Sequence, residues 1–488
     1  MRKLLMNIQE LEPRAVWQYF HQITQVPRPS AQEEKIQQYI LDEAARLGLP
    51  AERDAGGNIR VRKAASAGRE NEPGVILQAH LDMVAQKNRD TVHDFSKDPI
   101  RTVIDGDWVR ADGTTLGADN GIGVAMVLAI LADKNLSHPP LEALFTASEE
   151  IGLIGASAVQ PNWLNGSVLL NLDFEDEGEL CIGCAGATNA DYTVPLQYEP
   201  LQGQGYQLHV GGLKGGHSGV EIHLQRGNAI KILARVLQTL HDEQDCALKL
   251  ASITAGDLRN AIPREADAVV ALNGSALAAV QQTLHELTAQ IRAELPAEDQ
   301  GLQISLEPGD AITRVLSETS ARQAIAVLRN LHNGVDRMSV DIPGLVETSN
   351  NVAVVRTDDA LRVRCMLRSS VDSARDDLAA RMAVLLELAG GSAEYSGAYS
   401  GWKPQPHAEL VEKLAALGEK IYGKAPPVKA IHAGLECGIL YTHYPHWQMA
   451  SFGPTIVSPH SPDEKVNIAS VARSYCWLVS YLNFRKNI

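Results

Sequence analysis

The pattern of apolar and polar residues changes along the chain and divides it into segments of two kinds. The N-terminal part contains short continuous apolar runs, which predict buried strands: GVILQAH, LEALFTA and SVLLNLDF. Between these runs, the helical periodicity of EEKIQQYILDEAARLG predicts an amphipathic helix, and GIGVAMVLAILAD predicts a buried one. Alternation of this kind indicates a largely parallel sheet that is covered by helices on both faces.

From about Ala187 the predicted strands alternate in polarity, as in YQLHVGG, ADAVVALNG and LRVRCMLRSS. Amphipathic helices such as NAIKILARVLQTLHD and SARQAIAVLRNLHN separate them. The order strand, helix, strand, strand, helix occurs twice, from about Tyr206 to Leu295 and from about Leu302 to Tyr395. This order predicts an internal duplication of a split βαβ unit, which gives two ferredoxin-like repeats.

Continuous apolar runs occur again near the C-terminus, after the linker-like stretch SGWKPQPHAEL. The segments VKAIHAG, HWQMASFGP and IASVARSYCWLVSYLNF predict further buried strands and a final helix. We therefore expect an α/β domain with a mixed, mostly parallel sheet, formed by residues 1–186 and 400–488. An α+β lid domain of residues 187–399 is predicted to be inserted into it.

Charge and cysteine content limit the possible partners and the compartment. The net charge of −15 argues against nucleic acid and anionic membranes as partners, because both require a basic surface. No apolar stretch reaches the roughly 18 to 20 residues of a membrane span. The start MRKLLMNIQELEP lacks the sustained apolar core of a signal peptide, and the six dispersed cysteines suit a reducing compartment. These features predict a cytoplasmic protein.

Titratable side chains recur where the predicted strands end. In open α/β sheets, ligands bind beyond the carboxyl ends of the strands. Five segments deliver such residues to that edge: His80 and Asp82, Asp119, Glu149 and Glu150, Asp173, and His460. Each one alone is explained by ordinary hydrogen bonding or turn chemistry. Their recurrence predicts a metal site, and a mixed set of imidazoles and carboxylates suits zinc first.

The motifs HLDMV, GADNGIG, SEEIGLIGA, NLDFED and HSPDE together resemble the di-zinc family of aminoacylases, carboxypeptidases and dipeptidases. The resemblance covers nearly the whole chain. Within that family, the long doubled lid and the segments GLKGGHSGVEIH, RNAIPREA and HAGLECG are most similar to a bacterial dipeptidase.

The resemblance implies a role for each residue at the strand ends. Two zinc ions, which cobalt or manganese can replace, would be bound by five ligands: His80 and Asp173 for one ion, Glu150 and His460 for the other, and Asp119 for both. Asp82 would hydrogen-bond the far nitrogen of His80 and so fix its tautomer. Glu149 would be the general base that moves protons during hydrolysis. The adjacent acids of SEEIG would thus have different tasks.

Four further residues would contact the substrate. His217, in GGHSG, matches a lid histidine that stabilises the oxyanion, and Asn260, in RNAIP, matches a supporting lid residue. Arg368, in CMLRSS, matches the lid arginine that binds the free carboxylate. Glu436, in HAGLECG, lies where the family lines the amino end of the substrate, and His432 is an alternative supporting residue.

These features predict a cytoplasmic metallopeptidase that hydrolyses unblocked dipeptides, including those with C-terminal histidine. The protein would be a homodimer without nucleic-acid or membrane partners. An N-acyl-amino-acid deacylase or a carboxypeptidase with the same metal centre is the main alternative. A third reading is a zinc-stabilised binding protein without catalysis, for which Glu149 would have no use.

Overall fold

The computed structural model describes residues 7–242, 248–272 and 276–484. The chain divides into two compact units. The first contains residues 1–183, 402–430 and 435–488, and the second contains residues 184–401 and 431–434. None of the helices in the described ranges is both long and apolar enough to cross a membrane.

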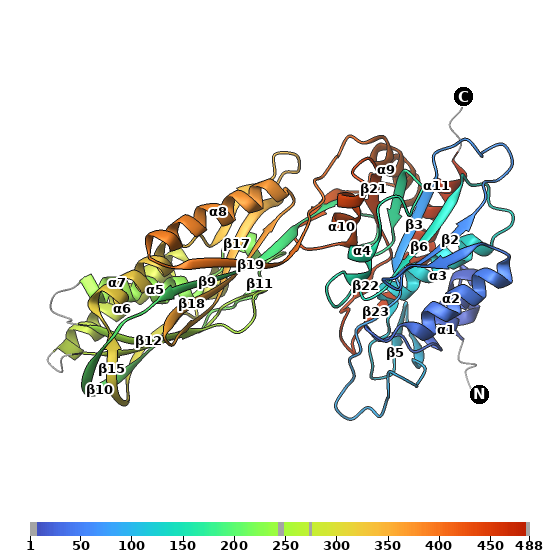
Figure 1. Ribbon diagram of the computed structural model, residues 1–488. Coiled ribbons are helices and arrows are strands. Elements are labelled where there is room, and N and C mark those ends of the chain that lie inside the picture. The colour runs from blue at the N-terminus through green and yellow to red at the C-terminus, as the bar shows by residue number, and fades with distance from the viewer. Residues whose placement is uncertain (1–6, 243–247, 273–275, 485–488) are drawn as a thin grey trace. The chain divides into compact units, whose positions relative to one another are not determined.

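A mixed sheet forms the centre of the first unit (Figure 1). Its strand order is β1-β2-β6-β3-β7-β21-β8-β20. The strands are β1 (Ala51–Arg53), β2 (Ile59–Lys63), β3 (Val75–His80), β6 (Leu141–Thr146), β7 (Val168–Asn171), β8 (Leu180–Cys184), β20 (Val428–Ile431) and β21 (Gln448–Ser451). The neighbours β6, β3, β7 and β21 are parallel, whereas β1, β2 and β8 pair antiparallel. The predicted mixed, mostly parallel sheet is thus confirmed.

Helices pack on this sheet: α1 (Arg14–Thr24), α2 (Glu34–Leu47), α3 (Ala118–Ala132), α4 (Ile154–Ala158), α9 (Glu409–Tyr422), α10 (Glu436–His443) and α11 (Ile468–Asn483). α2 ends where Gly48 adopts a left-handed conformation with φ of 72°, which glycine tolerates without strain. α3 is apolar on all sides and lies between α1 and β3, so nearly all of its residues are buried.

A small antiparallel sheet joins the late part of the chain to the start of α3. It contains β4 (Thr102–Asp105), β5 (Trp108–Ala111), β22 (Ile456–Val457) and β23 (Lys465–Asn467), in the order β22-β23-β5-β4. β23 pairs with β5, and Val466 lies opposite Val109. This pairing brings the β22–β23 loop, which carries His460, close to the segment between β5 and α3.

The second unit is built on a sheet of nine antiparallel strands (Figure 1). The main path is β15-β10-β14-β12-β17-β18-β9-β19, and β16 pairs with β17. Its strands are β9 (Gly186–Pro195), β10 (Tyr198–Gly211), β12 (Lys249–Ala255), β14 (Ala266–Ala271), β15 (Gln303–Leu316), β16 (Gly334–Met338), β17 (Val346–Thr357), β18 (Ala360–Ser369) and β19 (Ser392–Tyr399). One hydrophobic core joins the sheet to its helices, α5 (Ala229–Asp242), α6 (Leu277–Glu294), α7 (Glu318–Asn330) and α8 (Asp372–Leu388).

The strand pairing corrects one detail of the expected duplication. The strand predicted to open the second copy, from about Leu302, is β15, and it pairs with β10 in the first half of the sheet. β9 takes the matching place in the second half, between β18 and β19. Residues that precede the first copy in the chain therefore complete the second half, which local periodicity cannot reveal.

Candidate active site

The topology of the first unit brings the predicted metal ligands to one edge. β6, β3 and β7 are adjacent and parallel, so the segments that follow them meet at the carboxyl end of the sheet. His80 is the last residue of β3, Glu149 and Glu150 follow β6, and Asp173 follows β7. Asp119 lies in the first turn of α3.

Asp119 lies between the two histidines. Its Oδ1 is 2.9 Å from Nε2 of His80, and its Oδ2 is 3.2 Å from Nε2 of His460. Nε2 of His80 is also 3.3 Å from Asp173 Oδ1, and Nε2 of His460 is 3.0 Å from Glu150 Oε2. The five residues therefore form two groups that share the Asp119 carboxylate.

The donor set fits divalent cations. Ligand atoms of His80, Asp119 and Glu150 all lie within 4.8 Å of one another, so these three residues could hold a metal ion. Glu150 Oε1 is buried and has no hydrogen-bond partner in the described part of the chain. Hydrogen bonds with Asp119 and Glu150 raise the pKa of His460 to about 11, because the two carboxylates favour a positive charge at this place. Imidazole nitrogens and carboxylate oxygens are ligands that zinc accepts.

Glu149 lies beside these ligands and differs from its neighbour Glu150. Burial raises the pKa of Glu149 well above its ordinary value, and the carboxylates of Asp173, Glu436 and Glu150 raise it further. Its side chain is not part of the candidate metal group. Glu149 is half-buried, and a carboxyl group with a raised pKa can accept and return a proton.

Asp82 has more partners than the sequence predicted. Its Oδ1 lies 3.4 Å from His80 Nδ1, whose nearer contact is the backbone oxygen of Asp82 at 3.2 Å. The same carboxylate accepts the backbone N–H of Glu149 at 2.9 Å and of Glu150 at 3.2 Å, and Ser30 Oγ donates to it at 2.8 Å. Asp82 is fully buried, so these bonds tie the turn that carries both acids to the end of β3.

Sequence reasoning missed three buried residues that contact the same loops. Glu33 accepts hydrogen bonds from the backbone N–H of Ser148 at 2.9 Å and from its hydroxyl at 2.7 Å. Arg28 and Glu464 both bond to the backbone of the loop before Asp119. Glu464 lies within the motif HSPDE, whereas no periodicity or motif marked Arg28 and Glu33.

Glu436 is the first residue of α10 and is fully buried. Its Oε2 accepts hydrogen bonds from Gln78 Nε2 at 2.6 Å and from Thr146 Oγ1 at 2.7 Å. Its Oε1 has no partner in the described residues, and burial raises the pKa of Glu436 to about 7. The structure places this acid beneath the strand ends, and its role at the amino end of a substrate stays a prediction.

Arg368 lies in β18 of the second unit and is 5% exposed. Its guanidinium contacts Tyr399 Oη at 3.4 Å and Met366 Sδ at 3.2 Å, and no carboxylate pairs with it within the described ranges. Burial, with Arg368 nearby, lowers the pKa of His432 to about 3 and also lowers that of His217. A buried guanidinium without a carboxylate partner among the described residues is a favourable place for an anion.

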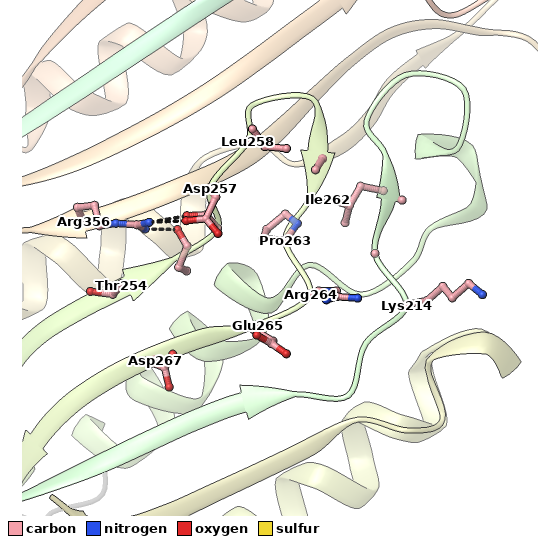
Figure 2. Close-up of a pocket in the computed structure, with 15 residues that line it drawn as sticks. Lys214, Thr254, Asp257, Leu258, Ile262, Pro263, Arg264, Glu265, Asp267 and Arg356 are labelled. Atoms are coloured by element: carbon pink, nitrogen blue, oxygen red, sulfur yellow. Dashed lines mark hydrogen bonds and ion pairs between the residues drawn. The ribbon is translucent and has the colours of Figure 1, made fainter. Parts of the chain in front are cut away.

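His217 lies on a two-stranded ribbon, β11 (Gly216–His217) and β13 (Ala261–Ile262), and Asn260 directly precedes β13. His217 lies opposite Ala261, and the backbone oxygen of Asn260 accepts the N–H of Ser218 at 2.8 Å. A pocket of about 560 Å³ lies beside this ribbon, and Figure 2 shows the residues that line it. Its lining has charges of both signs, including an ion pair between Arg356 and Asp257 at 2.9 Å. Neither His217 nor Asn260 lines this pocket.

Comparison with known proteins finds similarity over the whole chain. Residues 61–185 match the model of peptidase family M28, and residues 208–299 match the peptidase dimerisation domain. The cytosol non-specific dipeptidase of Escherichia coli is 43% identical over 98% of both chains. The crystal structure of an aminoacylhistidine dipeptidase from Vibrio alginolyticus is 43% identical, covers 99% of each chain and has a TM-score of 0.93.

A more distant structure shares the fold alone. Aminopeptidase PepT from Bacillus cereus is 15% identical, with 97% of this chain and 98% of that chain covered and a TM-score of 0.57. The identity to the first two proteins, over nearly their full lengths, is decisive. The chain belongs to the metallopeptidase family of the cytosol non-specific and aminoacylhistidine dipeptidases.

Proposed function

We propose that this protein is a metallo-dipeptidase that hydrolyses unblocked dipeptides, including those with C-terminal histidine, in the cytosol. The names of the Escherichia coli and Vibrio alginolyticus relatives support this substrate class, and the first also supports the compartment. The observation that carries the proposal is the Asp119 carboxylate, which presents one oxygen to each of two histidines beside the Glu149–Glu150 pair. A carboxylate that faces two histidines in this way could hold two metal ions close together, as two-metal hydrolysis needs.

The proposed centre would hold two zinc ions, which cobalt or manganese could replace. His80 and Asp173 would hold one ion, Glu150 and His460 would hold the other, and Asp119 would be a ligand of both. When bound, such ions polarise the scissile carbonyl and lower the pKa of the attacking water.

The remaining steps belong to the protein's own residues. Asp82 holds the turn of Glu149 through two backbone amides and lies close to His80. Glu149 takes a proton from the attacking water and then returns it to the nitrogen of the leaving amine. Its raised pKa suits it to hold the proton between these two steps.

Substrate binding involves the remaining candidates. Arg368 binds the free carboxylate, and its burial without a carboxylate partner among the residues that the structure describes supports this role. His217 stabilises the developing oxyanion, and Asn260 supports it through the backbone bond to Ser218, the residue after His217. Glu436 interacts with the amino end of the substrate.

The two compact units suggest a separate role for each domain. Residues 1–186 and 400–488 form the catalytic domain, and residues 187–399 form an inserted lid of two ferredoxin-like repeats. The match of residues 208–299 to the peptidase dimerisation domain supports a homodimer.

One alternative substrate class is an N-acyl amino acid, cleaved by the same centre. The complete burial of Glu436 favours this alternative. If the acid stays out of reach of the substrate, it cannot bind the ammonium group of a free dipeptide, and an N-acyl amino acid has no such group. The test compares kcat/KM for free dipeptides with that for N-acetyl amino acids, using protein loaded with zinc. Faster cleavage of free dipeptides supports the dipeptidase, and faster cleavage of the acetylated compounds supports the deacylase.

A further inference from the structure

Glu464 occupies an unusual position behind the loop that carries Asp119. Its carboxylate is buried and accepts hydrogen bonds from consecutive backbone N–H groups. These belong to Leu116 at 2.7 Å, Gly117 at 2.9 Å, Ala118 at 2.7 Å and Asp119 at 3.3 Å. One carboxylate therefore satisfies the amides of the shared ligand and of the three residues before it.

Arg28 contacts the carbonyl side of the same loop. It is 2% exposed, and its Nη2 donates to the backbone oxygen of Gly117. Its Nη1 donates to the backbone oxygens of Leu81 and Asp82, each at 2.9 Å. Arg28 thus joins the Asp119 loop to the segment that follows His80.

The fit around Arg28 depends on two glycines. A Cβ atom at Gly117 or at Gly121 would lie 2.5 Å from Nη2 of Arg28. Gly117 also has a positive φ of 69°, a backbone conformation that residues with a side chain rarely adopt. The sequence GADNG in this loop therefore makes room for a buried guanidinium as well as for the turn.

We propose that Glu464 and Arg28 are positioning residues that hold the Asp119 loop from its two sides and so set the affinity of the metal centre. This inference rests on the proposed function, because it assumes that Asp119 binds metal. Glu464 is four residues after His460, and its N–H bonds to the backbone oxygen of Ser461 at 3.0 Å. The two side chains thereby connect the backbone segments of three ligands, His80, Asp119 and His460.

The position of the Asp119 backbone affects metal binding directly. Asp119 can serve two ions only if both of its oxygens keep their directions, and its backbone determines where the side chain starts. Residues behind metal ligands typically change metal affinity 10- to 100-fold when they are replaced. A carboxylate is suited to this task because it accepts from several N–H groups at once.

The chain offers a matched control for each residue. Glu142 is also buried and accepts backbone N–H groups, from Asn165 at 2.7 Å and Gly166 at 2.8 Å, but it lies near the start of β6. Arg69 is 2% exposed and donates to the backbone oxygens of Leu482 at 2.6 Å and Phe484 at 3.0 Å. Neither control contacts a predicted ligand, so both report the cost of losing a buried charged anchor.

The experiment compares Glu464→Gln with Glu142→Gln, and Arg28→Lys with Arg69→Lys. Metal-free protein is titrated with Zn²⁺ in a calorimeter, Co²⁺ binding is followed by visible absorption, and the Tm of the metal-free protein is measured. All four variants are expected to have a lower Tm. Glu464→Gln and Arg28→Lys are expected to weaken metal binding about 10- to 100-fold and to alter the Co²⁺ spectrum, whereas the controls keep wild-type affinity.

Wild-type metal affinity in Glu464→Gln, with a Tm loss like that of Glu142→Gln, would overturn the inference and leave Glu464 a purely structural residue. If Glu464→Gln does not fold, Arg28→Lys against Arg69→Lys decides by the same criterion. Failure of wild-type protein to bind divalent metal would instead refute the proposed metal centre.

Discussion

Asp82→Asn tests whether the turn of the two acids must be held in place. The Asp82 carboxylate accepts three hydrogen bonds, from the N–H groups of Glu149 and Glu150 and from Ser30 Oγ. Asparagine keeps one neutral oxygen and turns an NH₂ group toward donors, so at least one buried amide loses its acceptor. A hydrogen bond to a charged group is worth about 1.5–3 kcal/mol, and an unsatisfied buried donor costs about 1–3 kcal/mol.

A conservative sum is about 3 kcal/mol, taken as one charged hydrogen bond and one unsatisfied amide. If this strain displaces Glu149, kcat/KM should fall about 100-fold, since each 1.36 kcal/mol corresponds to tenfold. Ser30→Ala is the matched control, because it removes one donor and leaves both amides bonded to Asp82. The control should lose less activity than Asp82→Asn, because it removes one hydroxyl bond to the carboxylate and leaves no buried amide without an acceptor.

The assay is dipeptide hydrolysis at saturating Zn²⁺, with the metal content of each protein measured in parallel. Both variants should contain the same metal as wild type under these conditions, which separates positioning from metal loss. Similar kcat/KM values for Asp82→Asn and Ser30→Ala would refute the reasoning. A loss of activity that follows metal content alone would assign Asp82 to metal binding through His80.

Three further outcomes are expected. Glu149→Gln should abolish turnover and keep both metal equivalents, whereas Glu150→Gln should lose metal; metal loss from the Glu149 variant would contradict its role as base. Chelation should inactivate the enzyme and leave the far-UV circular dichroism unchanged, because a chain of this length has its own core; collapse of the signal would contradict this. Arg368→Ala should cleave a dipeptide and its C-terminal amide at similar rates, because the contact with the free carboxylate is worth about 2–4 kcal/mol. Arg368→Lys should also cleave dipeptides poorly, because lysine lacks the bidentate fork of arginine. A continued strong preference of the alanine variant for the free acid would mean that another residue binds the carboxylate.

Much of the fold could be predicted from local pattern. Continuous apolar runs such as VILQA mark strands that are buried on both faces, because only a parallel sheet covered by helices hides every side chain. The positions of His80, Glu150 and Asp173 then follow, since the ends of neighbouring parallel strands meet at one edge. The amino-acid sequence by itself thus determined the sheet type and the residues that gather at its edge.

Only the tertiary structure decided which groups support those residues. Periodicity reports the face on which a residue lies and carries no information on partners far away in the chain. Glu464 bonds to the N–H of Asp119 across 345 residues, and β9 pairs with β18 in place of the expected β15. Asp82 likewise turned out to hold the turn of Glu149 as well as to lie near His80. Such contacts depend on where the backbone returns after long excursions, and that path is fixed by the packing of the whole domain.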